Sequence, residues 1–192
     1  MTERPILFSG PMVRAILEGR KSQTRRVVKP QPASHQGRIE WSYHNPGWWI
    51  VQGDVSNTWS RVRCHYGVPG DRLWVRETFN PDWTDRVIYK ADGGSAVEAG
   101  WPREPRWKPS IFMPRRACRL VLEVTGVRVE RLQEISSTDA EAEGVQCQPM
   151  SAKGFVDYYR DLWDRLNAKR APWASNPWVW VVEFRRLVPP ST

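Results

Sequence analysis

Cysteine and histidine are both scarce, since the 192-residue chain has three of each. The cysteines, Cys64, Cys118 and Cys147, are widely separated and lack the paired spacing of metal ligands, so the sequence predicts neither a disulfide framework nor a zinc site. His65 follows Cys64, but these two residues do not make a ligand set. We therefore expect no bound metal, no cofactor and a reducing, cytoplasmic location.

Long apolar runs are absent as well. No segment approaches the roughly 18 consecutive apolar residues that a transmembrane helix needs. The first residues lack the basic and then apolar pattern of a signal peptide. We expect neither a membrane-spanning nor an exported protein, and the lack of any repeat or heptad period excludes a solenoid or coiled coil.

Positive charge and tryptophan are abundant instead. Lysine and arginine number 29 against 21 acidic residues, which gives a net charge of +8 and favours acidic partners, nucleic acid above all. The 12 tryptophans suit stacking on bases as well as core packing. The length fits one domain, which we place at residues 1–188 with a frayed tail at 189–192, and we expect a monomer.

Hydrophobic periodicity and capping signals predict a mixture of strands and helices. The alternation of Leu73 and Val75 predicts a strand over 72–77 with these two side chains on one face, and Gly126 marks a bend or bulge in the extended segment 118–132. We predict further strands at 6–8, 86–90 and 178–184, and helices at 11–18, 136–144 and 155–167.

Residues 30–69 differ in composition, being rich in proline, glycine and tryptophan. We interpret them as a β-rich insertion with extended pieces at 38–43, 48–52 and 58–63 and a turn at Asn45-Pro46-Gly47. Their aromatic side chains fit two interpretations, a stacking wall for bases or packing against one another across strands. The aromatic residues concerned are Trp41, Tyr43, Trp48, Trp49 and Trp59.

The most informative stretch is 19–26, GRKSQTRR. Gly19 is expected to end the preceding helix, and we expect Lys21 to Thr24 to form a single turn that brings an amine and a hydroxyl to one small volume. Guanidinium groups pair with phosphate oxygens two at a time, so the surrounding arginines Arg20, Arg25 and Arg26 favour a phosphate-bearing ligand. The alternative is a solvated basic loop.

Several segments together resemble the ASCH domain, a branch of the PUA-like superfamily. They are 19–25 (GRKSQTR), 69–75 (PGDRLWV), 134–144 and 179–184 (VWVVEF). The segments 7–13 (LFSGPMV), 74–79 (WVRETF) and 109–115 (PSIFMPR) are similar to phage and prophage members of that family, although Phe112 stands where those proteins carry histidine. The resemblance implies an α+β fold, a small curved β-barrel with flanking helices and a cleft for a nucleobase or nucleotide.

The resemblance also implies roles for single residues. A family member that hydrolyses 4-acetylcytidine, an amidohydrolase, uses Lys, Thr and Glu at places matched here by Lys21, Thr24 and Glu143. In one route neutral Lys21 takes the proton of Thr24, which attacks the acetyl carbonyl, and Glu143 returns a proton to the amine. In the other route Lys21 and Glu143 activate water, and Thr24 holds the substrate. The plain alternative is an ordinary Lys21–Glu143 ion pair with a locally bonded Thr24.

Two other functions stay open at this stage. One is a module that binds RNA or a modified base without chemistry, and the other is a ribonuclease, as reported for other family members. For substrate or phosphate binding we add Trp74, Arg76, Glu77 and Arg115 to the arginines of residues 19–26. Glu77 is also the second candidate for the catalytic carboxylate, against the plainer interpretation of a surface acid at a strand end.

Overall fold

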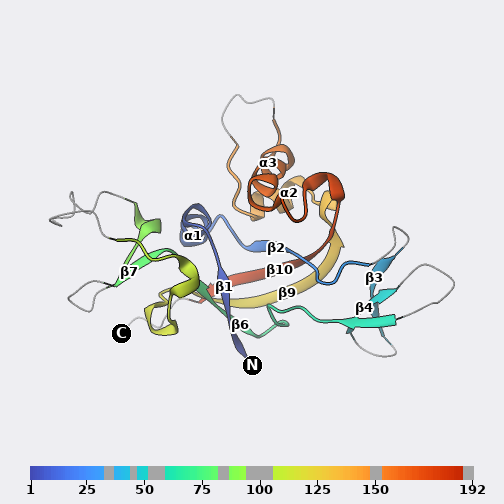
Figure 1. The fold of residues 1–192 in the computed structure, drawn as a ribbon, viewed down its shortest axis with the longest axis horizontal. Coiled ribbons are helices and arrows are strands. Elements are labelled where there is room, and N and C mark those ends of the chain that lie inside the picture. The colour runs from blue at the N-terminus through green and yellow to red at the C-terminus, as the bar shows by residue number, and fades with distance from the viewer. Residues whose placement is uncertain are drawn as a thin grey trace.

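The computed structural model describes residues 1–32, 37–43, 47–51, 59–81, 87–93, 106–147 and 153–187. Its centre is a five-stranded sheet with the strand order β1-β6-β9-β10-β2 (Figure 1). The strands are β1 (Glu3–Leu7), β2 (Gln23–Val27), β6 (Arg72–Arg76), β9 (Val121–Arg131) and β10 (Trp178–Leu187). Only the β1–β6 pair in this sheet is parallel. The fold class is α+β, as predicted.

The two longest strands, β9 and β10, carry the curvature of the sheet (Figure 1). Their register shifts between Glu183 and Phe184, which pair with Gly126 and Val124, so that Thr125 is the extra residue of a bulge. A Cβ atom at Gly126 would lie 2.5 Å from Glu183 Oε2, so the close approach at the bulge depends on glycine. The predicted bend at Gly126 is confirmed.

The described residues form the α-helices α1 (Gly10–Leu17), α2 (Ser137–Ala142) and α3 (Phe155–Asn167), each within two residues of the prediction. Ser136 caps α2, because its Oγ accepts a hydrogen bond from the Asp139 amide at 3.0 Å. Gly19, with φ of 74°, follows α1 in the left-handed region that glycine adopts without strain. Helices α2 and α3 lie together on the side of β2 and β10 that faces away from β9 in the view of Figure 1.

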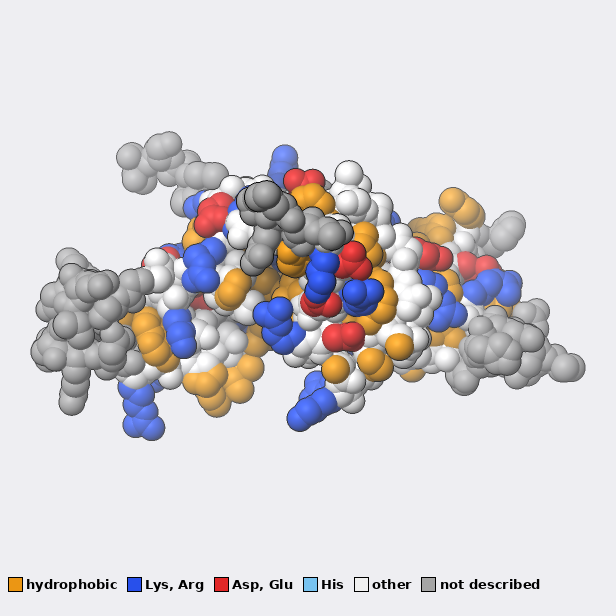
Figure 2. All heavy atoms as spheres, turned by 90° about the horizontal axis from the view of Figure 1, so that it is seen from above, with side chains coloured by type: hydrophobic (Ala, Val, Ile, Leu, Met, Phe, Trp, Pro, Cys, Tyr) orange, Lys and Arg blue, Asp and Glu red, His pale blue; other side chains and the backbone are white. Residues whose placement is uncertain are grey.

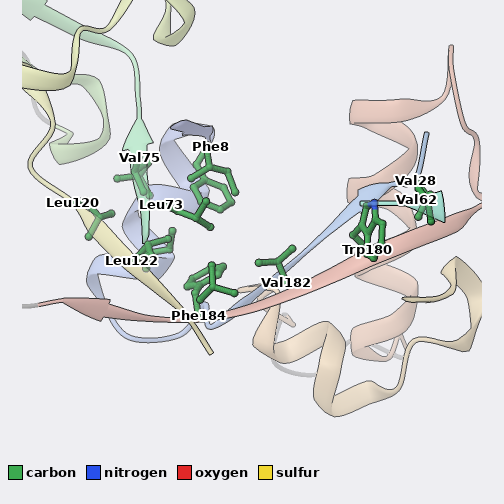
Figure 3. Close-up of a cluster of buried hydrophobic side chains, with 14 of the residues drawn as sticks. Phe8, Val28, Val62, Leu73, Val75, Leu120, Leu122, Trp180, Val182 and Phe184 are labelled. Carbon is green, nitrogen blue, oxygen red and sulfur yellow. The ribbon is translucent and has the colours of Figure 1, made fainter. Parts of the chain in front are cut away.

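Two hydrophobic clusters occupy the two faces of the sheet, and β10 contributes to both. Trp180, Val182 and Phe184 belong to one cluster, whereas Val179 and Val181 pack with α2 and α3 in the other. Successive side chains of a strand point to opposite faces, so a strand buried on both sides is apolar throughout. Figure 3 shows Val182 between the group around Phe184 and the group around Trp180.

Part of the segment 30–69 forms its own antiparallel sheet, of β3 (Arg38–Ser42), β4 (Gly47–Val51) and β5 (Trp59–Val62). The ring centroid of Trp48 lies 5.5 Å from that of Trp41 and 6.0 Å from that of Trp180, both edge to face. Cross-strand packing therefore accounts for Trp41 and Trp48, and it ties this sheet to the main core. Of the predicted turn, Asn45 and Pro46 lie outside the described residues.

A two-stranded hairpin of β7 (Phe79–Pro81) and β8 (Val87–Tyr89) stands at the other end of the molecule (Figure 1). Short 3-10 helices cover Lys90–Asp92, Ser110–Phe112, Arg115–Ala117, Leu132–Glu134 and Trp173–Ser175. No helix in the described ranges is long and apolar enough to cross a membrane. The tail predicted at 189–192 lies outside those ranges.

Candidate active site

The segment after Gly19 is extended, so the predicted turn from Lys21 to Thr24 is wrong. Lys21 forms an isolated antiparallel bridge with Glu143, and β2 begins two residues later. The main chain of Ser22 explains the difference, because its N–H donates to Ala142 O at 2.9 Å and its carbonyl accepts from Phe184 N at 2.8 Å. Partners that lie far along the chain thus replace the local hydrogen bonds of a turn.

Lys21 and Glu143 form a buried ion pair. Lys21 Nζ lies 2.7 Å from Glu143 Oε2, and it also donates to the main-chain carbonyls of Glu143 at 2.8 Å and of Gln23 at 2.7 Å. The exposed fraction of the side chain is 0% for Lys21 and 3% for Glu143. Burial lowers the pKa of Lys21, although the attraction of Glu143 opposes that shift.

Arg25 holds the other oxygen of the same carboxylate. Its Nη1 lies 3.3 Å from Glu143 Oε1, and its remaining nitrogens bind Glu130 Oε1 and Asp139 Oδ2, at 2.9 Å from Nε and 3.0 Å from Nη2. The Arg25 side chain has no exposed surface. Three carboxylates therefore share its charge, and Arg25 orients Glu143 instead of offering a free guanidinium to phosphate.

A cavity of about 390 Å³ lies beside this pair. Thr24, Arg26 and Glu143 provide polar groups in its wall, and the rings of Phe8, Tyr159 and Trp163 also line it. Lys21 is not among the lining residues of this cavity, although its Nζ lies 5.6 Å from the ring centroid of Phe8, which lines it. The combination of flat apolar walls with a few placed polar groups is typical of a site for a small heterocyclic ligand.

Figure 2 looks onto the side of the molecule that carries α2 and α3. Basic and acidic side chains lie next to hydrophobic ones at the centre of this face. Leu162, Leu166 and Asn167 of α3 extend the cavity wall towards solvent, and Leu166 is 55% exposed. This part of the cavity wall therefore reaches the protein surface.

Arg26 lines the cavity together with Arg25. Its Nη2 donates to the Leu7 carbonyl at 2.7 Å, and its guanidinium carbon lies 5.4 Å and 5.7 Å from the ring centroids of Phe8 and Tyr66. Its Nε is buried without a hydrogen-bond partner, and no carboxylate within the described residues forms an ion pair with Arg26. Arg26 thus differs from Arg25, its neighbour on the opposite face of β2.

The open edge of β2 supplies main-chain groups to the cavity. Ser22 O accepts a hydrogen bond from Phe184 N, and Val28 N donates one to Trp178 O, so residues of even number in β2 are the hydrogen-bonded positions opposite β10. Arg25 and Val27 therefore direct their N–H and C=O groups away from β10, and both residues line the cavity. Two cavity-lining residues thus have main-chain donors and acceptors at the open edge of the sheet.

The remaining predicted binding residues lie elsewhere. Arg20 pairs with Glu18 and lines a second cavity, of about 840 Å³, beside α2. Arg115 forms a surface ion pair with Glu3, at 2.8 Å from Nη2 to Oε1. The guanidinium carbon of Arg76 lies 5.4 Å from the ring centroid of Trp74, and neither residue lines the first cavity.

Glu77 is buried, so its interpretation as a surface acid is wrong. Only 1% of Glu77 is exposed, and Arg119 Nε and Nη2 bind its two carboxylate oxygens at 2.9 Å and 3.0 Å. Burial raises the pKa of Glu77, and Arg119 acts against that shift. Glu77 does not line the first cavity, so this position gives no support for its role as the catalytic carboxylate.

Sequence reasoning missed the aromatic wall of the cavity. Tyr159 and Trp163 belong to the apolar stripe of α3. This stripe predicts that one face of the helix is buried, but it does not predict which of its residues line a cavity. Phe8 follows the first strand and offers no signal beyond its hydrophobicity. The acidic partners of Arg25, Glu130 and Asp139, also carried no pattern that pointed to this site.

Comparisons with known proteins give one structural neighbour. No family model and no curated protein matches the sequence. The structure is similar to the crystal structure of an ASCH domain from Lactobacillus crispatus JV V101, with a TM-score of 0.42 and 12% identity, over 96% of this chain and 79% of that chain. No group of three or more residues able to hold a metal ion occurs within the described part of the chain. The curved mixed sheet, the helices beside it and the β-rich insertion form the expected α+β arrangement.

Proposed function

We propose that this chain is an ASCH-type amidohydrolase that removes the acyl group from acylated cytidine of the 4-acetylcytidine kind. The observation that carries the proposal is the placement of Glu143, which lines the cavity while Lys21 and Arg25 hold its two oxygens. Thr24 lines the same cavity. The resemblance of residues 19–25 and 134–144 to the family supplies the substrate class.

The geometry favours the route in which water is the nucleophile. Lys21 Nζ already donates three hydrogen bonds and is not among the cavity-lining residues, whereas Glu143 is, so Glu143 is the better-placed base. The Glu143 carboxylate takes a proton from water, whose oxygen attacks the acetyl carbonyl and forms a tetrahedral oxyanion. Glu143 then gives this proton to the cytosine nitrogen as the carbon–nitrogen bond breaks, which releases acetate and the free amine.

Each neighbouring group has a separate task in this route. Thr24 Oγ donates a hydrogen bond to the oxyanion and so stabilises the negative charge that develops in the transition state. Lys21 and Arg25 are positioning residues, because they fix the carboxylate and stabilise its charge. The aromatic walls sandwich the pyrimidine ring, and the open edge of β2 receives the polar edge of the base.

The test is acetate release from 4-acetylcytidine. We expect Glu143→Gln to lower kcat by at least about a hundredfold, the usual size of a general-base contribution, and Thr24→Val to lower it by about tenfold to a hundredfold. Arg186→Gln, at an exposed arginine outside the cavity, is the charge-matched control. Unchanged acetate release from Glu143→Gln, in protein with native circular dichroism, would contradict the proposal.

A binding module for RNA or a modified base is the second candidate. The aromatic walls and the guanidinium of Arg26 favour it, because they hold a base and a phosphate without any reaction. Such a module binds RNA equally well as wild type and as Glu143→Gln, and its affinity falls steeply with salt. Following strand scission in the same reactions tests the ribonuclease, which would need Glu143 as its acid or base.

A further inference from the structure

We infer that the cavity recognises a phosphate group at Arg26, so that the protein prefers a cytidine nucleotide or an RNA to the free nucleoside. This inference takes the deacylation reaction from the proposed function, but phosphate recognition depends on residues other than Lys21, Thr24 and Glu143. The residues that carry it are Arg26, which donates to Leu7 at the end of β1, and hydroxyl groups that include Ser9 before α1, whereas Glu143 follows α2.

The first observation is the unbalanced charge of Arg26. Arg25 and Arg128 each contact three carboxylates, and Arg119 contacts Glu77 and Asp92. Half-buried Arg26 has a carbonyl oxygen and two aromatic rings as partners, and its Nε has no partner among the described residues. Half-buried Arg76 and Arg131 also have carbonyl and ring partners without a carboxylate, but of these three arginines Arg26 is the one that lines the cavity. Removing a charge from water without an opposite charge is unfavourable, and a bound anion would complete the site.

The second observation is the set of hydroxyl groups that shares the cavity with Arg26. Ser9, Thr78 and Ser110 line it, and each hydroxyl is a donor suited to a phosphate oxygen. Ser9 precedes the first turn of α1, and that turn contains no acidic residue. The positive potential at this helix end adds to that of Arg26. The α1 side of the cavity is therefore complementary to an anion.

The third observation is the fixed orientation of the guanidinium. Arg26 Nη2 donates a hydrogen bond to Leu7 O, and the guanidinium group lies near the rings of Phe8 and Tyr66. An arginine immobilised before the ligand arrives loses little conformational entropy on binding. Arg26 and Glu143 both line one cavity of about 390 Å³, so one bound ligand can present a phosphate to Arg26 and its base to Glu143.

The decisive measurement is the preference of the protein for a phosphorylated substrate. We would compare kcat/KM for 4-acetylcytidine, its 5′-monophosphate and a short RNA with one acetylated cytidine. Wild type is expected to prefer a phosphorylated form by tenfold or more, the size of one charge-assisted interaction. Arg26→Gln reduces that ratio to about one, Arg26→Lys keeps part of it, and the control Arg186→Gln leaves it unchanged. A preference for the monophosphate assigns the subsite to a terminal phosphate, and a preference for the RNA alone assigns it to a backbone phosphate.

Two outcomes would overturn the inference. One is equal kcat/KM for all three substrates, and the other is a ratio that Arg26→Gln leaves at its wild-type value. Binding of cytidine and of cytidine 5′-monophosphate or a cytidine-containing RNA, measured by calorimetry, separates this inference from the proposed function. Tighter binding of a phosphorylated ligand that is lost in Arg26→Gln supports the phosphate subsite even if no acetate is released. Acetate release without a phosphate preference supports the amidohydrolase and rejects the subsite.

Discussion

Lys21 and Glu143 stand 122 positions apart in the sequence, and their side chains meet at 2.7 Å with almost no exposed surface. A buried pair of this kind costs desolvation energy, and the loss of one partner leaves the other charge uncompensated. Here Arg25 shares Glu143, so the carboxylate keeps one cationic partner when Lys21 is removed. The interaction energy between Lys21 and Glu143 can therefore be measured separately from that between Arg25 and Glu143.

The first prediction is the coupling energy of this pair. Glu143→Gln leaves the Lys21 ammonium buried beside a neutral amide, and we expect a loss of about 3 kcal/mol in the free energy of unfolding. Lys21→Met costs less, about 1–2 kcal/mol, because Arg25 remains at the carboxylate. Urea denaturation of both single variants and of the double variant measures the coupling. Additive effects would show that the two side chains do not stabilise each other.

The second prediction concerns Gly144, which follows α2 with φ of 84°. A Cβ atom there would lie 2.9 Å from Ala15 Cβ and 3.0 Å from Lys21 Cβ. We expect Gly144→Ala to destabilise the protein by about 2–3 kcal/mol and to reduce activity, because the strained backbone also displaces Lys21. Gly70→Ala is the matched control, since Gly70 has φ of 90° and open space around it. A loss no larger than that of the control would rule out the steric part of the argument.

The third prediction is the acid sensitivity due to Asp71. The hydrogen bond from the Thr2 amide, at 2.7 Å, and the contacts of Arg4 and the Val68 amide lower the pKa of Asp71 well below 3.8, although burial acts in the opposite direction. A carboxyl whose pKa is lower in the folded state adds stability above its unfolded pKa, and this contribution disappears as the pH falls through the folded value.

Asp71→Asn should therefore cost about 1–2 kcal/mol at neutral pH, in proportion to the hydrogen bonds lost. The difference from wild type should shrink as the pH falls below 3.8. Denaturant unfolding at several pH values checks both statements. Glu141→Gln, at an exposed acid, provides the comparison, and a deficit of Asp71→Asn that stayed constant down to the lowest pH would disprove the role of the carboxylate charge.

The fourth prediction separates packing from base stacking in the insertion. Trp48 is half-buried between Trp41 and Trp180, so Trp48→Ala should cost about 2–3 kcal/mol of stability. Trp59 is 44% exposed, and Trp59→Ala should change stability by less than about 0.5 kcal/mol. Thermal unfolding measures these effects. Binding of single-stranded RNA by Trp59→Ala tests the stacking wall, because a tenfold loss of affinity without a change in stability indicates direct contact with bases.

Local signals predicted most of the fold. The capping serine at 136 and the apolar repeat of 155–167 located α2 and α3, and the glycine at 126 located the bulge. These features depend on residues that are neighbours in the sequence, so pattern and capping rules apply to them. The extended conformation at Lys21 escaped prediction because its main-chain partners are Ala142 and Phe184.

Contacts between residues that are far apart in the sequence also limit what the sequence predicts about the site. Arg25 and Arg26 are adjacent and look alike in the sequence, but Arg25 faces carboxylates from β9 and α2 while Arg26 faces two aromatic rings. Glu77 looks like a surface acid until Arg119, 42 positions away, is placed beside it. The grouping of Lys21, Thr24 and Glu143 came from the family resemblance, and their catalytic roles stay a prediction until acetate release is measured.

Strand β2 has a single neighbour in the main sheet, β10, which is formed by residues 178–187. During synthesis on the ribosome, about 150 further residues must therefore be added after the segment with Lys21, Thr24 and Arg26 before its partner strand β10 is available for pairing. A contact of such long range slows folding. It also means that the cavity, whose wall includes residues of α3, is completed only late in synthesis.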